Sequence, residues 1–220
     1  MMKTKAVVFD AYGTLFDVNS AAEKCKDKIG AKWETFANFW RTTQLEYTWL
    51  RSLMKRHKNF WDITEDSLDK SMKVFNINKN MKSELLSLYK ILSPYPEVRE
   101  VLEDLKKKNL KLAILSNGTP DLLNELVENN KLNNLFDDLF SIEDVKIYKP
   151  DPSVYELPIK KYKIKSGEIT FLSANTWDVS GGGNFGYNSI WVNRHNSVFD
   201  ILDFEPKNEI NNLTQLLDKI

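Results

Sequence analysis

A carboxylate directly follows an apolar run near the start of the chain, where it could act as a nucleophile. The run Lys5 to Phe9 (KAVVF) contains two valines and leads into Asp10-Ala11-Tyr12-Gly13-Thr14-Leu15. This pattern predicts a buried strand that ends in a tight loop, whose backbone N–H groups can bind an anion. A carboxylate in such a loop can attack an electrophilic centre. An isolated aspartate at a strand end more often only caps a turn, so the partners of Asp10 decide its role.

A second apolar run, Leu110 to Leu115, also ends in small polar residues. It is followed by Ser116-Asn117-Gly118-Thr119-Pro120, in which the proline fits the first position of a helix. Ser116 and Asn117 would then lie near a helix N-terminus, which favours anions, and they are candidates for holding a substrate carboxylate. A simple capping turn explains this motif about as well.

A third run, Glu168 to Leu172, leads into Ser173-Ala174-Asn175-Thr176-Trp177-Asp178. Asp178 is a candidate base for a water molecule, because ester hydrolysis at neutral pH needs a nearby proton acceptor. Its alternative role is the N-cap of the following helix. Lys149 stands before Pro150, which favours an extended backbone, and it could neutralise and orient Asp10. A lone lysine at such a place is more often solvated.

These runs alternate with helical patterns, which predicts an α/β fold. The run Ser189 to Val192 is a fourth expected strand, and the stretches Val98 to Lys108 and Leu122 to Glu128 are expected helices. We therefore expect a Rossmann-like, mostly parallel sheet flanked by helices. In such sheets ligands bind beyond the carboxyl ends of the strands, where the polar residues described above would gather.

The segment between the first two strands predicts an all-helical insert. Residues 31 to 54 carry Trp33, Phe36, Trp40 and Tyr47 at helical spacing, and no strand pattern occurs between residues 16 and 93. Two prolines in Pro94-Tyr95-Pro96 stop any helix at the return. We expect a core domain of residues 1–15 and 94–220 and a helical cap subdomain of residues 16–93.

Composition narrows the function classes. The 220 residues include 31 basic and 31 acidic side chains, so no overall field favours nucleic acid or an anionic membrane as a partner. One cysteine and two histidines leave few parts for a zinc site or a Ser-His-Asp triad. The single cysteine suits a reducing compartment, and the chain has no apolar stretch of roughly 18 residues, so we expect a cytoplasmic protein.

On these residues the chain resembles the haloacid dehalogenase superfamily and, within it, the type II L-2-haloacid dehalogenases, over nearly its whole length. Asp10 with Thr14, the strand end at Ser116, Lys149 and the loop to Asp178 are features that many phosphatases share. Longer strings narrow the resemblance: Trp40-Arg41, QLEYTWLRSLM at 44–54, LSNG at 115–118, SANTWD at 173–178, Phe185-Gly186 and WVNR at 191–194.

Two departures from the phosphatase pattern favour a dehalogenase. A phosphatase of this superfamily carries an aspartate two residues after the nucleophile to protonate the departing alkoxide, and Tyr12 holds that place here. A halide is a weak base and leaves without a proton. Ser173 and Asn175 stand in the loop where acids that bind Mg²⁺ would be expected. The resemblance therefore implies carbon–halogen cleavage without metal or cofactor. A Mg²⁺-dependent phosphatase and a non-catalytic relative are the alternatives.

The resemblance also implies a mechanism. Asp10 would attack C2 of a short L-2-haloalkanoic acid with inversion, and water would hydrolyse the resulting ester to a 2-hydroxy acid. Arg41 and Asn117 would receive the halide. The implied catalytic residues are Asp10, Thr14, Arg41, Lys149, Tyr155, Ser173, Asn175 and Asp178. The implied substrate-binding residues are Ala11, Tyr12, Arg41, Leu45, Phe60, Ser116, Asn117 and Trp177.

Individual roles follow from the same resemblance. Thr14 would hydrogen-bond to Asp10, Lys149 and Tyr155 would hold the carboxylates, and Ser173, Asn175 and Asp178 would position the water. Leu45, Phe60 and Trp177 would form an apolar wall, although aromatic residues at helical spacing are more often plain core. A homodimer joined through the aromatic cap is implied, while intramolecular burial of the cap helices would explain the same residues. Gly181 to Gly183 are expected to loosen the loop that holds Asp178, and Thr42 leaves chain-length preference open.

Overall fold

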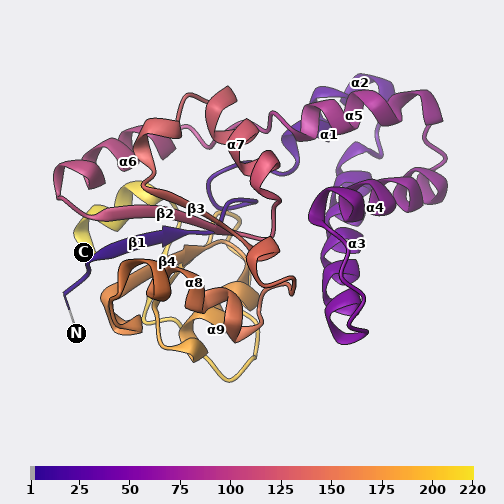
Figure 1. Ribbon diagram of the computed structural model, residues 1–220. Coiled ribbons are helices and arrows are strands. Elements are labelled where there is room, and N and C mark those ends of the chain that lie inside the picture. Colours follow the sequence, from indigo (N-terminus) through magenta and orange to yellow (C-terminus); the bar gives the residue numbers. More distant parts are fainter. Residues whose placement is uncertain (1–2) are drawn as a thin grey trace.

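The chain forms one six-stranded sheet in the computed structural model, which describes residues 3–220 (Figure 1). The strand order is β3-β2-β1-β4-β5-β6, and every pair of neighbours is parallel. The strands are β1 Ala6–Phe9, β2 Lys111–Ser116, β3 Asp138–Ser141, β4 Ile169–Ser173, β5 Asn188–Val192 and β6 Asn208–Ile210. All residues of β1 and β4 are buried, as expected of central parallel strands covered on both faces. The predicted Rossmann-like α/β fold is confirmed.

Four helices cover the two faces of the sheet. Figure 1 shows α6 (Val98–Lys107) and α7 (Pro120–Asn129) on one side and α8 (Pro152–Tyr162) and α9 (Thr176–Phe185) on the other. α6 buries the apolar residues at positions 98, 101, 102 and 105, which helical spacing places on one face. α7 starts as its sequence predicts, with Pro120 in the first turn and the Thr119 hydroxyl accepting a hydrogen bond from the Leu122 N–H.

The segment between β1 and β2 is helical from residue 20 to residue 89 apart from its connections, as predicted. It contains α1 (Ser20–Lys24), α2 (Lys26–Ile29), α3 (Trp33–Leu53), α4 (Phe60–Phe75) and α5 (Lys82–Tyr89), which lie to one side of the sheet in Figure 1. Short 3-10 turns occur at η1 Lys79–Met81, η2 Asn133–Leu135, η3 Ile142–Asp144, η4 Ser166–Glu168 and η5 Leu213–Asp218. The exact division into core 1–15 with 94–220 and cap 16–93 stays a prediction.

The two connections between the sheet and the helical segment run side by side. Phe16 forms an isolated antiparallel bridge with Pro94, and the Tyr95 N–H donates to the Leu15 carbonyl over 3.0 Å. The Asp17 N–H donates to the Ser93 carbonyl over 2.9 Å. The helical segment is therefore tied to the loop that follows β1 by backbone hydrogen bonds.

The sheet register brings the polar strand ends together. Phe9, the last residue of β1, pairs with Ile114 of β2 on one side and Leu172 of β4 on the other. Asp10 therefore emerges between the carboxyl ends of β2 and β4, which carry Ser116 and Ser173. This is the edge where the chemistry was expected.

The three consecutive glycines do not loosen a loop, which corrects the sequence-based expectation. They lie inside α9, where a Cβ atom on Gly181 would lie 2.5 Å from the Tyr155 hydroxyl and one on Gly182 would lie 2.7 Å from the Phe171 ring. A Cβ atom on Gly183 would collide with the Phe204 ring. The glycines therefore let α9 pack closely against its neighbours.

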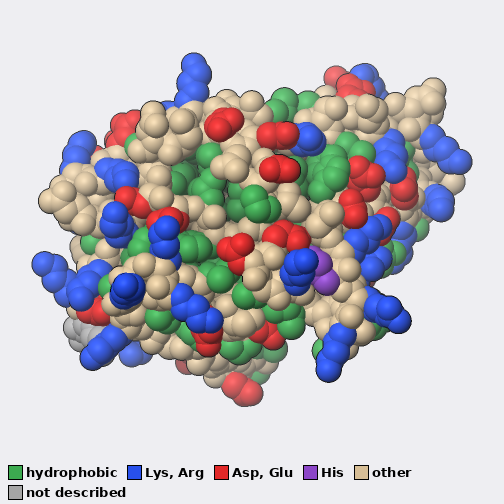
Figure 2. All heavy atoms as spheres, viewed as in Figure 1, with side chains coloured by type: hydrophobic (Ala, Val, Ile, Leu, Met, Phe, Trp, Pro, Cys, Tyr) green, Lys and Arg blue, Asp and Glu red, His purple; other side chains and the backbone are tan. Residues whose placement is uncertain are grey.

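The surface carries both charge signs. Figure 2 shows basic and acidic side chains interspersed over the visible face, in keeping with the equal totals of 31 each. Among the described helices, none combines the length and the apolar character that a membrane crossing requires. The localisation expectation itself stays a prediction.

Candidate active site

The Asp10 carboxylate is 5% exposed and accepts hydrogen bonds from three side chains. Oδ2 accepts from the Thr14 hydroxyl over 2.9 Å and from Asn175 Nδ2 over 2.9 Å. Oδ1 accepts from Lys149 Nζ over 3.3 Å. Oδ2 is therefore well satisfied, whereas Oδ1 keeps only one long hydrogen bond and is the oxygen better able to attack a ligand.

A second carboxylate lies across Lys149 from Asp10. Lys149 Nζ is 2.9 Å from Asp178 Oδ2, and the Tyr155 hydroxyl donates to Asp178 Oδ1 over 2.7 Å. Lys149, Tyr155 and Asp178 are all fully buried. Burial raises the pKa of the Asp178 carboxyl, the Lys149 ammonium opposes that shift, and the negative charge of Asp10 adds to it. Asp178 is thus a stronger base than an ordinary aspartate.

Tyr155 stays protonated in this position. Burial, followed by the neighbouring Asp178 carboxylate, raises the pKa of its phenol well above the usual value of 10.0. The hydroxyl therefore serves as a hydrogen-bond donor to Asp178 at neutral pH. Asp178 lies in the first turn of α9, while Asn175 occupies the N-cap position, so capping is not the role of Asp178.

Two buried serines shape the loops beside Asp10. Ser116 Oγ accepts from the Gly118 N–H over 3.0 Å, and Ser173 Oγ accepts from the Asn175 N–H over 3.1 Å. Asn117 Oδ1 accepts from the Lys149 N–H over 3.2 Å, and across residues 3–220 its Nδ2 makes no hydrogen bond. The structure therefore brings Ser116, Asn117 and Ser173 to the predicted edge, while their predicted contacts with substrate or water stay predictions.

The helical segment covers the loop that follows β1, residues 10–15, which we call the nucleophile loop because it begins with the predicted nucleophile Asp10. Arg41 of α3 donates from Nη2 to the Tyr12 carbonyl oxygen over 3.4 Å. The Tyr12 ring lies 5.3 Å from the Phe60 ring and 5.7 Å from the Tyr89 ring, centroid to centroid. Ala11 is fully buried. Most of the predicted substrate-binding residues thus converge on the loop after β1.

The other two members of the predicted apolar wall are Leu45 and Trp177. Leu45 is half-buried on α3, four residues after Arg41. Trp177, at the start of α9, packs edge-to-face against Trp49 of α3 with ring centroids 5.4 Å apart. This contact joins the helical segment to the sheet domain directly above the loop after β4, and it places Trp177 at the boundary between the two.

Tyr12 is held as a neutral phenol. Burial raises its pKa well above 10.0, the neighbouring Tyr89 phenol and the Asp10 carboxylate raise it further, and Arg41 acts in the opposite direction. A group with so high a pKa is a poor proton donor at neutral pH. Position 12, which holds an acidic residue in a phosphatase of this superfamily, therefore carries no effective proton donor in this chain.

Comparison with known proteins gives this arrangement a family. A family model described as haloacid dehalogenase-like hydrolase matches residues 4–186. The chain belongs to the haloacid dehalogenase-like hydrolases.

Individual members of the family resemble the chain along most of its length. The "(S)-2-haloacid dehalogenase 4A" of Burkholderia cepacia is 40% identical over 96% of this chain and 93% of its own. A solved dehalogenase structure superposes with a TM-score of 0.97 at 37% identity, covering 100% of this chain and 98% of the other. The L-2-haloacid dehalogenase of Xanthobacter autotrophicus with covalently bound chloropropionic acid has a TM-score of 0.90 at 32% identity, covering 97% and 96%.

In this haloacid dehalogenase-like hydrolase, Arg194 supports the nucleophile loop from outside, which sequence reasoning missed. Its Nη2 donates to the Thr14 carbonyl over 2.8 Å, and its Nη1 lies 2.8 Å from Glu97 Oε1. The guanidinium also stacks over Tyr95, 3.7 Å from the ring centroid. Thr14 in turn accepts the Ala174 N–H on its hydroxyl oxygen over 2.8 Å while donating to Asp10. The only available signal was the position of Arg194 just after a strand end.

Sequence reasoning also missed three other members of the site region, namely Gln44, Tyr89 and Trp49. Gln44 is 1% exposed and accepts a hydrogen bond from Arg41 Nη1 over 2.8 Å. Tyr89 stacks on Tyr12 from α5. A buried glutamine on an otherwise aromatic helix was the signal that could have found the first of these.

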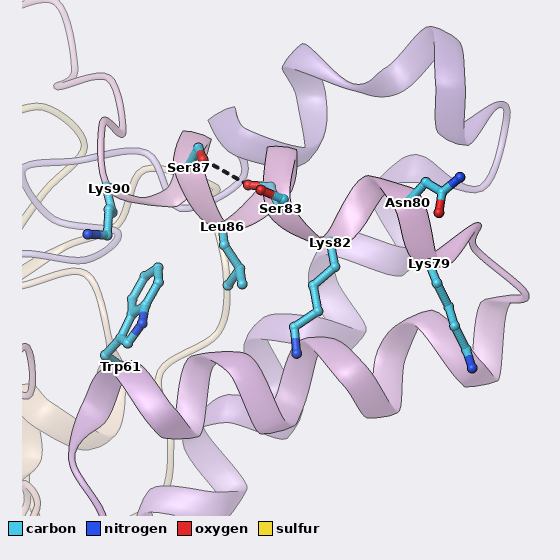
Figure 3. Close-up of a pocket in the computed structure, with 8 residues that line it drawn as sticks. All are labelled: Trp61, Lys79, Asn80, Lys82, Ser83, Leu86, Ser87 and Lys90. Atoms are coloured by element: carbon cyan, nitrogen blue, oxygen red, sulfur yellow. Dashed lines mark hydrogen bonds between the residues drawn. The ribbon is translucent and has the colours of Figure 1, made fainter.

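A groove in the helical segment of this hydrolase lies apart from Asp10. It runs between α4 and α5 and is lined by Trp61, Lys79, Asn80, Lys82, Ser83, Leu86, Ser87 and Lys90 (Figure 3). Lys82 pairs with Asp69 at 2.9 Å, and Lys90 pairs with Glu125 at 3.3 Å. Two of its ammonium groups thus have carboxylate partners already, and none of the predicted site residues lines it. Within residues 3–220, no three His, Cys, Asp or Glu side chains gather as metal ligands would.

Proposed function

We propose that this chain is an (S)-2-haloacid dehalogenase. It hydrolyses short L-2-haloalkanoic acids to 2-hydroxy acids, with inversion at C2, through an ester on Asp10. The proposal rests chiefly on one observation: Asp10 is held by Thr14, Asn175 and Lys149, with a poor acid at position 12 and a second, buried carboxylate across the lysine. A carboxylate so held can displace a leaving group that needs no proton.

In the first step, Asp10 Oδ1 forms a bond to C2 as the carbon–halogen bond breaks. The halogen leaves as halide with the bonding electron pair. Thr14 and Asn175 hold Oδ2, and so keep the carboxylate rotated with Oδ1 toward the substrate. The Lys149 ammonium lies 3.3 Å from Oδ1 and helps to hold the carboxylate in place.

In the second step, a water attacks Cγ of the Asp10 ester. Asp178 removes the proton from that water, and its raised pKa makes it suited to this. The bond between Cγ and the ester oxygen then breaks, and the departing oxygen takes the proton that Asp178 holds. The product hydroxyl therefore carries the original Oδ1, and the water oxygen remains on Asp10. Asn175 and Ser173 shape the loop in which the water is held.

The remaining site residues bind the substrate in this proposal. Arg41 and Asn117 supply a cation and an amide for the halide or the carboxylate, and the backbone of Ala11 and Tyr12 with Ser116 frames the anion site. Tyr12, Phe60, Leu45 and Trp177 shield the short alkyl group from water. Tyr12 and Phe60 already stack on each other beside Arg41, which supports this assignment.

We further propose that no metal takes part. The groups around Asp10 donate hydrogen bonds, and one of them is an ammonium, whereas Mg²⁺ prefers several oxygen ligands including carboxylates.

We also propose that the chain forms a homodimer in a cytoplasmic setting. Leu50, Leu53 and Met54 at the end of α3 are 50%, 80% and 60% exposed, and such a cluster is typical of an interface. Sedimentation analysis should give twice the chain mass, and Leu53→Glu should shift it to one chain mass. A monomeric parent chain would contradict the dimer.

The buried single cysteine suits a reducing compartment.

One assay tests the function. Halide release is measured from each enantiomer of 2-chloropropionate in EDTA, beside hydrolysis of a phosphate ester with added Mg²⁺. We expect halide from the L enantiomer alone and no phosphate release. Phosphate release that depends on Mg²⁺ would instead indicate a phosphatase, and no turnover of either substrate would indicate a non-catalytic relative.

The covalent route has its own test. In a single turnover in ¹⁸O water with the protein in excess, the label should appear on Asp10 and not in the product. Label in the product but not in Asp10 would exclude the ester.

A further inference from the structure

Gln44 is a buried amide, and among residues 3–220 Arg41 is the only charged side chain that hydrogen-bonds to it. It lies three residues after Arg41 on α3, so both side chains project from the same face of the helix. Gln44 Oε1 accepts from Arg41 Nη1 over 2.8 Å, and the Gln44 side chain is almost fully enclosed. A polar side chain so enclosed is retained only where its hydrogen bonds are made.

The network around Gln44 fixes which way its amide points. Gln44 Nε2 donates to Thr64 Oγ1 over 2.6 Å and to the Tyr89 hydroxyl over 3.0 Å. Thr64 donates its own hydroxyl proton to the Phe60 carbonyl over 2.8 Å, so toward Gln44 its oxygen acts as an acceptor. The amide nitrogen must therefore face Thr64, and the amide oxygen must face Arg41.

Arg41 is held by neutral partners. Its two hydrogen bonds go to the Gln44 amide oxygen and to the Tyr12 carbonyl oxygen. Across residues 3–220, Arg41 enters no ion pair. Its guanidinium is therefore fixed beside the nucleophile loop with its full positive charge available, because neither partner carries a compensating negative charge.

We propose that Gln44 is a positioning residue that holds the Arg41 guanidinium for an anion without neutralising it. It thereby sets the affinity of the site for small monoanions that carry an alkyl group. This inference rests on the proposed function for the identity of the anion as a 2-haloacid. A glutamate at this position would also accept a hydrogen bond from Arg41 but would cancel its charge, and it would lack the N–H that donates to Thr64, which explains why a neutral amide is suited to it.

The test compares two substitutions of nearly equal size. Gln44→Glu keeps a hydrogen-bond acceptor for Arg41 and adds a negative charge. The Tyr89 hydroxyl, already 3.4 Å from Gln44 Oε1 as a donor, and the Thr64 hydroxyl can both turn to donate to the new carboxylate. Gln44→Met removes the hydrogen bonds and adds no charge. Gln215→Glu makes the same chemical change at the other glutamine, which is exposed near the end of the chain, and serves as the control. Each variant is measured for KM and kcat with L-2-chloropropionate, for thermal stabilisation by propionate, and for Tm.

We expect Gln44→Glu to raise KM and the propionate dissociation constant by about tenfold or more, with a smaller change in kcat, because a charge-assisted interaction with the anion is lost. Its Tm should stay at or above that of Gln44→Met, since an ion pair with Arg41 replaces the original bond. Gln44→Met should lower Tm and raise KM less. A purely structural role would instead move Tm in both variants and leave KM unchanged.

The proposal is overturned if Gln44→Glu keeps the KM and propionate affinity of the parent chain, or if Gln44→Met raises KM as much as Gln44→Glu does. Should Gln44→Glu fail to fold, Gln44→Met decides alone, and a parental KM in that variant would overturn the proposal. Propionate binding needs no turnover. A parent chain that releases no halide but binds propionate in a Gln44-dependent way would therefore remove the proposed function and leave this inference standing.

Discussion

Lys149 Nζ lies 2.9 Å from Asp178 Oδ2, and both side chains are fully enclosed by protein. Taking Lys149 away would leave Asp10 and Asp178 as two buried carboxylates without their shared cation. Removing one partner of a buried ion pair costs about 3–5 kcal/mol, because the other charge stays desolvated. We expect Lys149→Met to lower the free energy of unfolding by about that amount and to abolish halide release.

Urea unfolding of Lys149→Met beside Lys107→Met provides the measurement. Lys107 is exposed on α6 and pairs with Asp104, so its loss should leave the free energy of unfolding nearly unchanged. Equal stability of the two variants would contradict the role assigned to Lys149.

Asp178→Asn should separate the two chemical steps. The amide keeps the size of the side chain but cannot accept a proton from water, so the Asp10 ester should form and persist. We expect kcat to fall by about 10²- to 10⁴-fold, with a burst of one halide per chain. Mass spectrometry of the tryptic peptide that contains Asp10 should find it increased by one propionate group.

The control for this ester-accumulation experiment is Asp104→Asn, which alters a surface carboxylate on α6. It should turn over repeatedly, with no persistent adduct. An Asp178→Asn variant that shows no burst while still binding propionate would place Asp178 in the first step instead.

The acid limb of the pH profile, where the rate of ester hydrolysis falls at low pH, should follow the protonation of the Asp178 carboxylate. Burial raises its pKa, and the hydrogen bond from Tyr155 lowers it. The base must be ionised, so ester hydrolysis is fast above the pKa and slows as the pH falls through it. Tyr155→Phe removes a donor that stabilises the ionised form, so the limb should move to higher pH.

Single-turnover rates of the second step, measured across pH for the parent, Tyr155→Phe and Tyr47→Phe, test this prediction. Tyr47 lies on α3 beside Lys70 and should leave the limb in place when substituted. A limb that moves to lower pH in Tyr155→Phe would reverse the assigned sign.

Arg194 and Glu97 form a buried pair that braces the nucleophile loop. Their side chains are 7% and 9% exposed, and the arginine also holds the Thr14 carbonyl. Arg194→Met should destabilise the chain by about 3–5 kcal/mol because Glu97 is left without its cation. The double variant Arg194→Met with Glu97→Gln should recover part of that loss in urea unfolding. Full additivity of the two single changes would show that the pair does not interact.

The sequence predicts the central strands well and the peripheral ones poorly. β1, β2, β4 and β5 are buried runs that hydrophobicity alone reveals, and each begins and ends within one residue of its expected bounds. β3 and β6 were missed because they are four and three residues long and carry polar residues, among them Asp138 and Glu209. Such short segments become strands through pairing with a neighbour, which a local pattern does not contain.

The candidate site divides in the same way. Asp10 directly follows a strand, Lys149 precedes a proline, and Asp178 lies in the first helical turn after a strand. These three residues could be found because parallel strands bring such positions to one edge. The links between elements could not be found. The contact of Arg194 with Thr14 depends on how the segments after β1 and β5 meet. The contacts of Gln44 with Thr64 and Tyr89 depend on how α3, α4 and α5 pack, and no spacing within one element encodes either. The roles assigned to these residues stay predictions until the variants are measured.

The glycines of α9 have a consequence for engineering. Glycine is about 1 kcal/mol less favourable than alanine within a helix, so three in succession leave α9 dependent on contacts with the rest of the chain for its own existence. The usual stabilising replacement of a helical glycine by alanine would here force apart Tyr155, Phe171 or Phe204. Substitutions meant to raise the Tm of this protein should therefore avoid α9. The Asp178 carboxylate in the first turn of α9 is held in place by the contacts of the helix with its neighbours, and not by the intrinsic stability of the helix.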